Sequence, residues 1–150
     1  MPNYRVEITE TLPFSRSRVF ELLADHNRLG SLVGLPVKRI RDSDQADPNG
    51  TGSVRWIGVG PVGFEETILM FEPEHLIEYS VTSFSAFRNH LARIRLSALP
   101  DGSTRLHYTA EFDEVVPYSG RTLELAVERV LRRGVERLHH VLSDNADQRE

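Results

Sequence analysis

The sequence predicts an α+β fold, in which a curved antiparallel sheet of seven strands packs around one long C-terminal helix. Three observations support this prediction. Apolar residues recur at three- and four-residue steps through Pro117–Leu142, which is typical of an amphipathic helix. Most of the preceding chain alternates apolar and polar residues in short stretches, as strands do. Turn residues such as Asp47-Pro48-Asn49-Gly50 separate these stretches, so the strands should follow one another as hairpins.

The N-terminal third of the chain predicts a strand and then helical structure. Apolar and polar residues alternate from Tyr4 onward. Ser15 is typical of a helix N-cap and precedes an apolar face that ends near Asp25–Asn27. The residues Leu29–Val33 could form a second helical turn, so we expect one or two short helices. Six further strands are predicted at Val37–Arg41, Ser53–Ile57, Val62–Phe71, His75–Thr82, Arg88–Leu99 and Ser103–Phe112.

The long C-terminal helix is the element around which the sheet should fold. About 25 helical residues rise ~1.5 Å each and span roughly 37 Å, enough to cross a small domain. A curved sheet seldom closes tightly on a single helix, so we expect a cavity between them. Gly134 lies on the apolar stripe of this helix. It indicates either a close approach of strand to helix or a wall of that cavity. Residues Asp144–Glu150 are expected to form a frayed polar tail.

The composition bounds the class of protein. With 150 residues, 39% of them hydrophobic and 27% charged, we expect a single soluble domain over residues 1–150. No apolar run is long enough to span a bilayer, and the absence of a signal segment predicts a cytoplasmic protein. Zero cysteines exclude disulfides and thiolate metal sites. The net charge of -4 argues against a nucleic-acid partner, and the expected assembly is a monomer or homodimer.

Several segments resemble those of a known superfamily. They are the strand start Gly52-Ser53-Val54-Arg55, the hairpin from Glu66-Thr67-Ile68 to Glu72-Pro73-Glu74-His75-Leu76-Ile77-Glu78-Tyr79, and the strand from Gly102-Ser103-Thr104-Arg105-Leu106 to Phe112. With the element order, they resemble the polyketide cyclase/dehydrase-like branch of the START-like (SRPBCC) helix-grip proteins, over essentially the whole chain. The resemblance implies a deep pocket for a lipid, sterol, polyketide or other hydrophobic small molecule. It does not decide the activity, because the superfamily includes carriers, aromatase/cyclases and chaperone-cofactor domains.

Strand alternation predicts which side chains face this pocket. The strand Val62–Phe71 is ambiguous because both of its faces are largely apolar, and we take Phe64, Glu66, Ile68 and Met70 as its inward set. The predicted pocket residues are Arg55, Phe64, Glu66, Ile68, Tyr79, His90, Ile94, Tyr108, Val127, Leu131 and Gly134.

Polar residues on this otherwise apolar inner face are the candidates for chemistry. Arg55 and Glu66 should pair, either as a structural salt bridge or as a catalytic couple. His90 is interpreted as a hydrogen-bonded core histidine or as a group that orients a ligand or transfers a proton. Tyr79 and Tyr108 either point hydroxyls into the pocket or serve as core aromatics.

Three functions remain open from the sequence. The first hypothesis is cofactor-free binding of a hydrophobic or amphipathic small molecule, and no spacing of residues predicts a metal site. The second is an enzyme of the cyclase, aromatase or dehydratase type, which uses the same cavity. The third is a chaperone-assisting or protein-interaction module that uses its surface. A cavity with convergent polar groups would favour the first two hypotheses.

Overall fold

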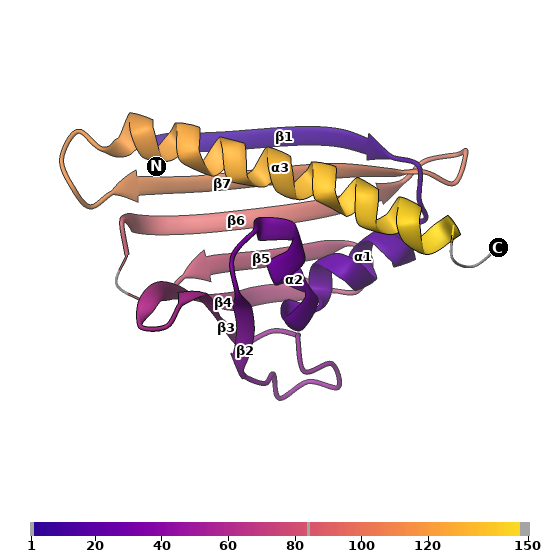
Figure 1. Ribbon diagram of the computed structural model, residues 1–150, viewed down its shortest axis with the longest axis horizontal. Coiled ribbons are helices and arrows are strands. Elements are labelled where there is room, and N and C mark those ends of the chain that lie inside the picture. The colour runs from indigo at the N-terminus through magenta and orange to yellow at the C-terminus, as the bar shows by residue number, and fades with distance from the viewer. Residues whose placement is uncertain (1, 84, 148–150) are drawn as a thin grey trace.

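The computed structural model describes residues 2–83 and 85–147 (Figure 1). Among these residues the strands are β1 (Tyr4–Leu12), β2 (Val37–Arg41), β3 (Val54–Val59), β4 (Val62–Glu72), β5 (Leu76–Val81), β6 (Phe87–Ala98) and β7 (Thr104–Glu114). The helices are α1 (Arg16–Ala24), α2 (His26–Val33) and α3 (Gly120–Asp147). The seven strands form one antiparallel sheet in the order β1-β7-β6-β5-β4-β3-β2. The predicted α+β fold is confirmed, with two short helices after the first strand.

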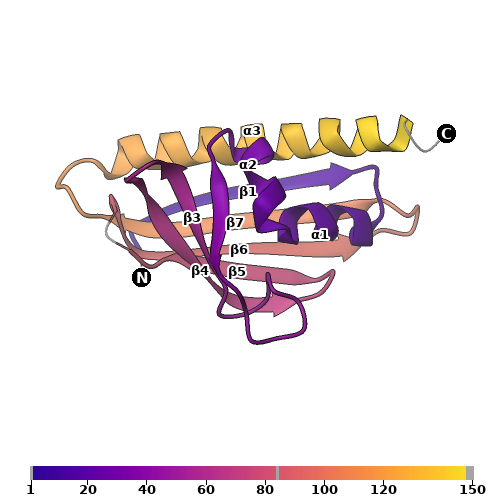
Figure 2. The same cartoon turned by 60° about the horizontal axis from the view of Figure 1, so that its bottom comes forward.

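The helices α1, α2 and α3 lie on one face of the sheet, as Figure 2 shows. α3 packs against β1, β7 and α2, while α1 contacts β6 and α3. At the other side of the sheet, β2 and β3 curl towards the helices (Figure 2). The helical face of the sheet is therefore concave. None of the helices among the described residues combines the length and the apolar composition needed to cross a membrane.

Local capping residues fix the two short helices. The Ser15 side chain accepts a hydrogen bond from the Arg18 backbone N–H and begins α1, which confirms the predicted N-cap. The Asp25 carboxylate accepts from the Asn27 N–H and begins α2. α2 ends at Val33 and is capped by Gly34, whose φ of 77° is left-handed and suits glycine. The open question of a second helical segment is thereby answered, and α2 packs against α3.

The core is densely filled where α1 meets the C-terminal half of α3. Val19, Leu22 and Leu138 are 0%, 2% and 1% exposed there, and Leu142, in the C-terminal part of α3, is also buried. Truncating one of these leucines to alanine would cost about 2–5 kcal/mol, since the packed surroundings relax only in part. This packing anchors one end of α3 to the sheet.

A bulge in β4 changes which of its residues face the core. The register of β4 against β5 shifts between Ile68 and Met70, so the alternation of inward and outward side chains skips a position there. Met70 is 41% exposed, whereas Phe71 packs against the core with its ring 5.3 Å from that of Phe20. The expectation that Met70 faces inward is wrong, because alternation through Val62–Phe71 assumed an uninterrupted strand.

The long helix differs from its predicted limits at both ends. It begins at Gly120 and not at Pro117, because Tyr118 has a left-handed φ of 68° that interrupts a helix. It continues beyond the predicted end at Leu142 to Asp147. The first part of the predicted tail, from Asp144, is therefore helical, and residues 148–150 lie outside the described residues.

Candidate ligand-binding cavity

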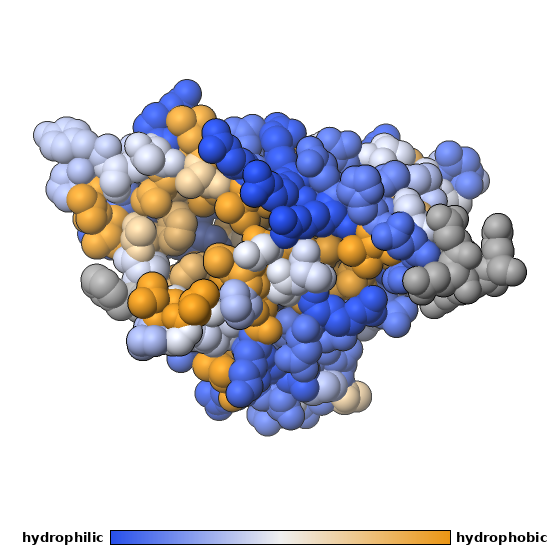
Figure 3. Space-filling view, viewed as in Figure 1, coloured by the Kyte–Doolittle hydropathy of each residue, from blue (hydrophilic) through white to orange (hydrophobic). Residues whose placement is uncertain are grey.

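A cavity of about 280 Å³ lies between the concave sheet, α2 and α3. An apolar space of ~150 Å³ is enough to hold benzene, so this cavity has room for a larger molecule. Leu35 and Val130 line the cavity and are each 45% exposed, so they lie at its opening. In Figure 3, apolar side chains surround a hollow beneath the N-terminal half of α3. The cavity therefore communicates with the outside through an apolar opening.

The structure places most of the predicted pocket residues in the wall of this cavity. Those that line it are Arg55, Phe64, Glu66, Tyr79, His90, Ile94, Tyr108, Val127, Leu131 and Gly134. Ile68 does not line the cavity; it is 1% exposed and lies in the packed core. Phe64 and Glu66, which we expect to face inward from the first half of β4, both line the cavity. Whether these residues bind a ligand stays a prediction.

Arg55 and Glu66 form a buried ion pair in the sheet wall. They are directly opposite each other on β3 and β4, and Arg55 Nε donates to Glu66 Oε1 at 2.9 Å. Their side chains are 5% and 8% exposed. Burial raises the pKa of the Glu66 carboxyl, and the adjacent Arg55 guanidinium opposes that rise. The pair places two mutually compensating charges beside an apolar space.

Two tyrosines from β5 and β7 share a hydrogen bond next to this pair. The Tyr79 and Tyr108 hydroxyls contact each other, and both side chains are buried. The Arg55 guanidinium carbon lies 4.5 Å from the centroid of the Tyr79 ring, within the range of a cation–π contact. Burial raises the pKa of Tyr108 to about 12 and that of Tyr79 well above its ordinary value. Both hydroxyls are therefore protonated at neutral pH.

His90 completes the polar part of the sheet wall. Its Nδ1 accepts a hydrogen bond from the Val81 backbone N–H at 3.1 Å, and its ring centroid is 5.9 Å from that of Tyr79. Burial, assisted by the positive charge of Arg55, lowers the pKa of His90 to about 4. His90 is thus hydrogen-bonded, as one interpretation predicts, and it also lines the cavity. That it orients a ligand or transfers a proton stays a prediction.

The helical wall of the cavity is apolar. Val127, Leu131 and Gly134 of α3 face the sheet wall. A Cβ added at Gly134 would have the Leu32 carbonyl oxygen of α2 as its nearest neighbour, at 3.7 Å. That is an ordinary van der Waals distance, so no close backbone approach requires glycine here. Of the two explanations for Gly134, the geometry agrees with a position in the cavity wall.

The sequence prediction missed the contribution of α2. Leu29, Leu32 and Val33 line the cavity opposite the sheet, and so does Phe87 at the start of β6. The helical spacing of the three α2 residues was visible in the sequence. It showed an apolar face but not the neighbour against which that face would pack.

A second hollow of about 290 Å³ lies between β1 and α3. Its lining includes Glu10, Arg132, Glu136, His139 and His140, and it is more polar than the cavity described above. Within residues 2–83 and 85–147, no group of three or more His, Asp or Glu side chains is placed to hold a metal ion. The charged residues of this hollow therefore do not form a metal site.

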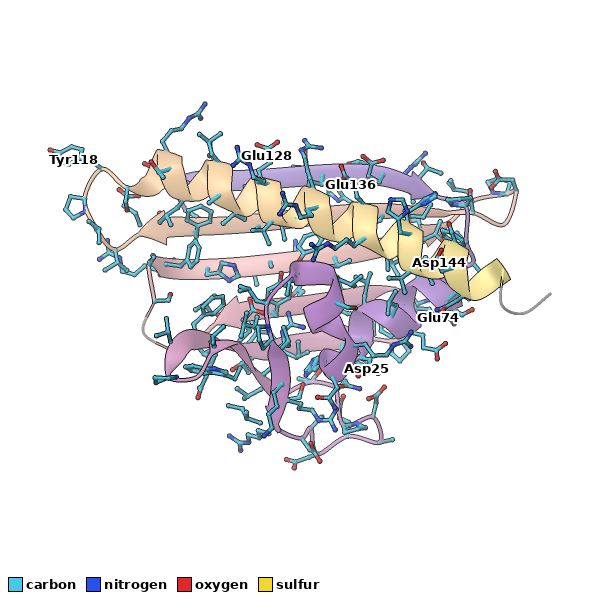
Figure 4. All side chains as sticks on the ribbon, in the orientation of Figure 1. Asp25, Glu74, Tyr118, Glu128, Glu136 and Asp144 are labelled. Carbon is cyan, nitrogen blue, oxygen red and sulfur yellow. The ribbon has the colours of Figure 1, made fainter. Side chains whose placement is uncertain are left out.

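Further apolar residues are exposed on loops. Val59 and Val62, at the β3–β4 turn, are 64% and 77% exposed. Tyr118, in the loop between β7 and α3, is 99% exposed and points away from the molecule (Figure 4). Single exposed apolar residues are common on protein surfaces, so these positions alone do not define an interface.

The fold and the cavity agree with a known family. The family model described as "Polyketide cyclase / dehydrase and lipid transport" matches residues 4–143. The chain belongs to this family. The match spans all seven strands and most of α3, and it confirms the resemblance to the polyketide cyclase-like branch of the START-like superfamily. No curated protein matches the chain in sequence.

Solved structures share the fold of this polyketide cyclase-family chain at low sequence identity. A START superfamily protein from Mycobacterium smegmatis is 13% identical, with a TM-score of 0.79 over 95% of this chain and 99% of that chain. XoxI from Bacillus cereus is 16% identical, with a TM-score of 0.74 over 95% and 98% of the two chains. Ara h 8.0201 is 12% identical, with a TM-score of 0.69 over 93% and 98%. These likenesses show the fold alone.

Proposed function

We propose that this protein binds a hydrophobic or amphipathic small molecule in the cavity between the sheet and α3. The observation that carries the proposal is the division of the cavity wall into an apolar helical side and a sheet side with a few convergent polar groups. Ligand sites in proteins have this composition, with apolar contacts for affinity and polar groups for orientation. The family description, which includes lipid transport, supports the same function.

A cavity-filling variant tests the proposal. Val127→Trp places a large ring in the helical wall, and the neutral fluorescent probe N-phenyl-1-naphthylamine should then bind at least about tenfold more weakly. Leu125→Trp is the matched control, because Leu125 lies on the same helix, is 53% exposed and is not part of the wall. Unchanged affinity in Val127→Trp would place the binding site elsewhere. Native mass spectrometry of freshly purified protein would identify a ligand that co-purifies.

A cyclase, aromatase or dehydratase is the second candidate. It is favoured by the gathering of ionisable groups with shifted pKa values at one cavity wall. In that case His90, Tyr79 or the Arg55–Glu66 pair would move a proton in a substrate that the cavity holds in one conformation. His90→Ala or Glu66→Gln should then abolish turnover and leave ligand affinity near its starting value. If no polyketide or lipid is ever converted, the enzyme hypothesis fails.

The chaperone-assisting or protein-interaction function is the remaining alternative. It would use exposed apolar residues such as Val59 and Val62 in place of the interior. The open cavity with its polar groups favours the two functions that need a small molecule.

A further inference from the structure

His90 lies where β6 departs from regular pairing. The register of β6 against β7 shifts between Arg88 and Leu91, and Asn89 has a left-handed φ of 52°. On the other side, the pairing of β5 with β6 stops at Tyr79 and Ala92. The Val81 N–H, just beyond that point, donates to the His90 side chain instead of to a backbone carbonyl. A backbone donor therefore fixes the orientation of the His90 ring.

This hydrogen bond determines which ring nitrogen carries the proton. A nitrogen that accepts a hydrogen bond from a backbone N–H cannot itself be protonated, so Nδ1 of His90 is the bare nitrogen. The ring is neutral at pH 7, because burial lowers its pKa to about 4. The remaining proton must then lie on Nε2. Nε2 has no hydrogen-bond partner among the described residues, and the ring lines the cavity.

The tyrosine pair adds a second donor to the same wall. Each tyrosine hydroxyl has one hydrogen and accepts through its oxygen. When Tyr79 and Tyr108 bond to each other, one hydroxyl donates and the other keeps its own hydrogen. The tyrosine pair thus adds one O–H to the His90 N–H on the sheet wall, beside the guanidinium of Arg55 that is paired with Glu66, and the helical wall of Val127 and Leu131 has no donor.

The charges of this wall are already balanced. Arg55 is paired with Glu66 at 2.9 Å, and His90 is neutral at pH 7. A carboxylate or an ammonium group brought into the cavity would be buried without a free counter-charge, which is costly. A hydrocarbon would avoid that cost but would leave the His90 N–H without a partner once water is displaced. An uncharged oxygen satisfies the donor without burying a charge.

We propose that His90 determines ligand specificity: its Nε2–H donates a hydrogen bond to an uncharged carbonyl oxygen at the end of the ligand that lies against the sheet. This inference rests on the proposed function. The ligand class it names is an uncharged carbonyl compound with an apolar body. The same wall disfavours carboxylates, whose charge would be buried without a counter-charge. It also disfavours pure hydrocarbons, which would leave the His90 N–H without a hydrogen-bond partner.

Three matched probes test this specificity. In 2-acetylnaphthalene, 2-isopropenylnaphthalene and 2-naphthoate the ring is constant, and the substituent is a ketone, its hydrocarbon isostere or a carboxylate. Calorimetric titration of the wild-type protein should give about tenfold tighter binding of the ketone than of the isostere, with the carboxylate weakest. Equal binding of ketone and isostere would overturn the role of His90 and leave the proposed function intact. Failure of all three to bind would overturn the proposed function itself.

Variants of His90 test whether this residue causes the tighter binding of the ketone. His90→Phe should reduce the advantage of the ketone over the isostere to about twofold or less, with little change for the isostere. His90→Gln keeps an N–H donor of similar reach and should retain the preference. His75→Phe, the same change at an exposed histidine outside the cavity wall, should alter none of the affinities. A preference for the ketone that survives in His90→Phe would overturn the proposal.

The tautomer can be measured without any variant. Long-range proton–nitrogen correlation spectra of the wild-type protein at pH 7 should show the His90 proton on Nε2 and a bare Nδ1. A proton on Nδ1 would remove the donor on which the proposal depends. This measurement keeps the proposal testable even if His90→Phe does not fold.

Discussion

The Arg55 guanidinium and the Glu66 carboxylate face each other across β3 and β4, with Nε 2.9 Å from Oε1 and both side chains less than a tenth exposed. Each charge compensates the other, so removal of one partner leaves a buried charge without a counter-ion. Removal of both partners avoids that cost. The pair is therefore expected to behave as a unit in measurements of stability.

We expect Glu66→Leu to lower the free energy of unfolding by about 3–5 kcal/mol. The double variant Arg55→Met/Glu66→Leu should recover most of that loss, because it buries no unpaired charge. Chemical denaturation of the wild type, the two single variants and the double variant gives the coupling energy. Glu128→Ala, which breaks the exposed pair with Arg132, should change stability little. A double variant no more stable than Glu66→Leu would contradict the expectation.

Gly134→Ala should stabilise the protein by up to about 1 kcal/mol, since alanine is the better helix former. The new methyl group would meet only the Leu32 carbonyl oxygen, at 3.7 Å. Thermal unfolding should show a rise in Tm of about 2–4 °C. Gly120→Ala is the contrasting variant, because its Cβ would overlap the Tyr4 ring, and its Tm should fall. A lower Tm for Gly134→Ala would mean that the cavity wall needs glycine at this position.

Stability should decrease as the pH falls below about 6.5, because two histidines resist protonation in the folded protein. Burial lowers the pKa of His26 to about 3 and that of His90 to about 4. Well above pH 6.5 both states hold neutral rings, so neither histidine affects stability. Between pH 6.5 and pH 4 the unfolded chain binds protons that the folded chain does not, and stability falls by ~1.4 kcal/mol per pH unit for each histidine.

Denaturation at pH 7 and pH 5 measures this loss. Each histidine should account for about 2 kcal/mol of the difference. His26→Gln and His90→Gln should each make the pH dependence shallower than that of the wild type. A wild-type protein that is equally stable at both values of pH would show that neither ring is held neutral.

The parts of the site that the sequence predicts correctly depend on local periodicity. Apolar and polar residues alternate along the strands of Tyr79, His90 and Tyr108, and this alternation predicts that all three face the cavity. Val127 and Leu131 followed from the apolar stripe of a long helix. Both kinds of pattern are set by which residues face water, so they are visible without knowledge of the tertiary structure.

Other features depend on contacts between distant segments, which periodicity does not contain. The hydrogen bond from Val81 to His90 exists because β6 departs from regular pairing near Asn89. The place of Leu32 in the cavity wall depends on how α2 packs against α3. In β4 both faces are largely apolar, so no residue pattern indicates the bulge that turns Met70 outward.

The bulge in β4 predicts opposite effects for two adjacent apolar residues. Phe71 is partly buried and packs against Phe20, so Phe71→Ala should lower the free energy of unfolding by roughly 2–3 kcal/mol, somewhat less than the ~3–5 kcal/mol typical of a fully buried phenylalanine. Met70→Ala should cost less than about 0.5 kcal/mol, because exposed side chains away from caps and packed contacts contribute little. Urea denaturation of both variants distinguishes the bulged strand from an uninterrupted one. If β4 were regular through this segment, Met70 would be the inward residue and the two costs would be reversed.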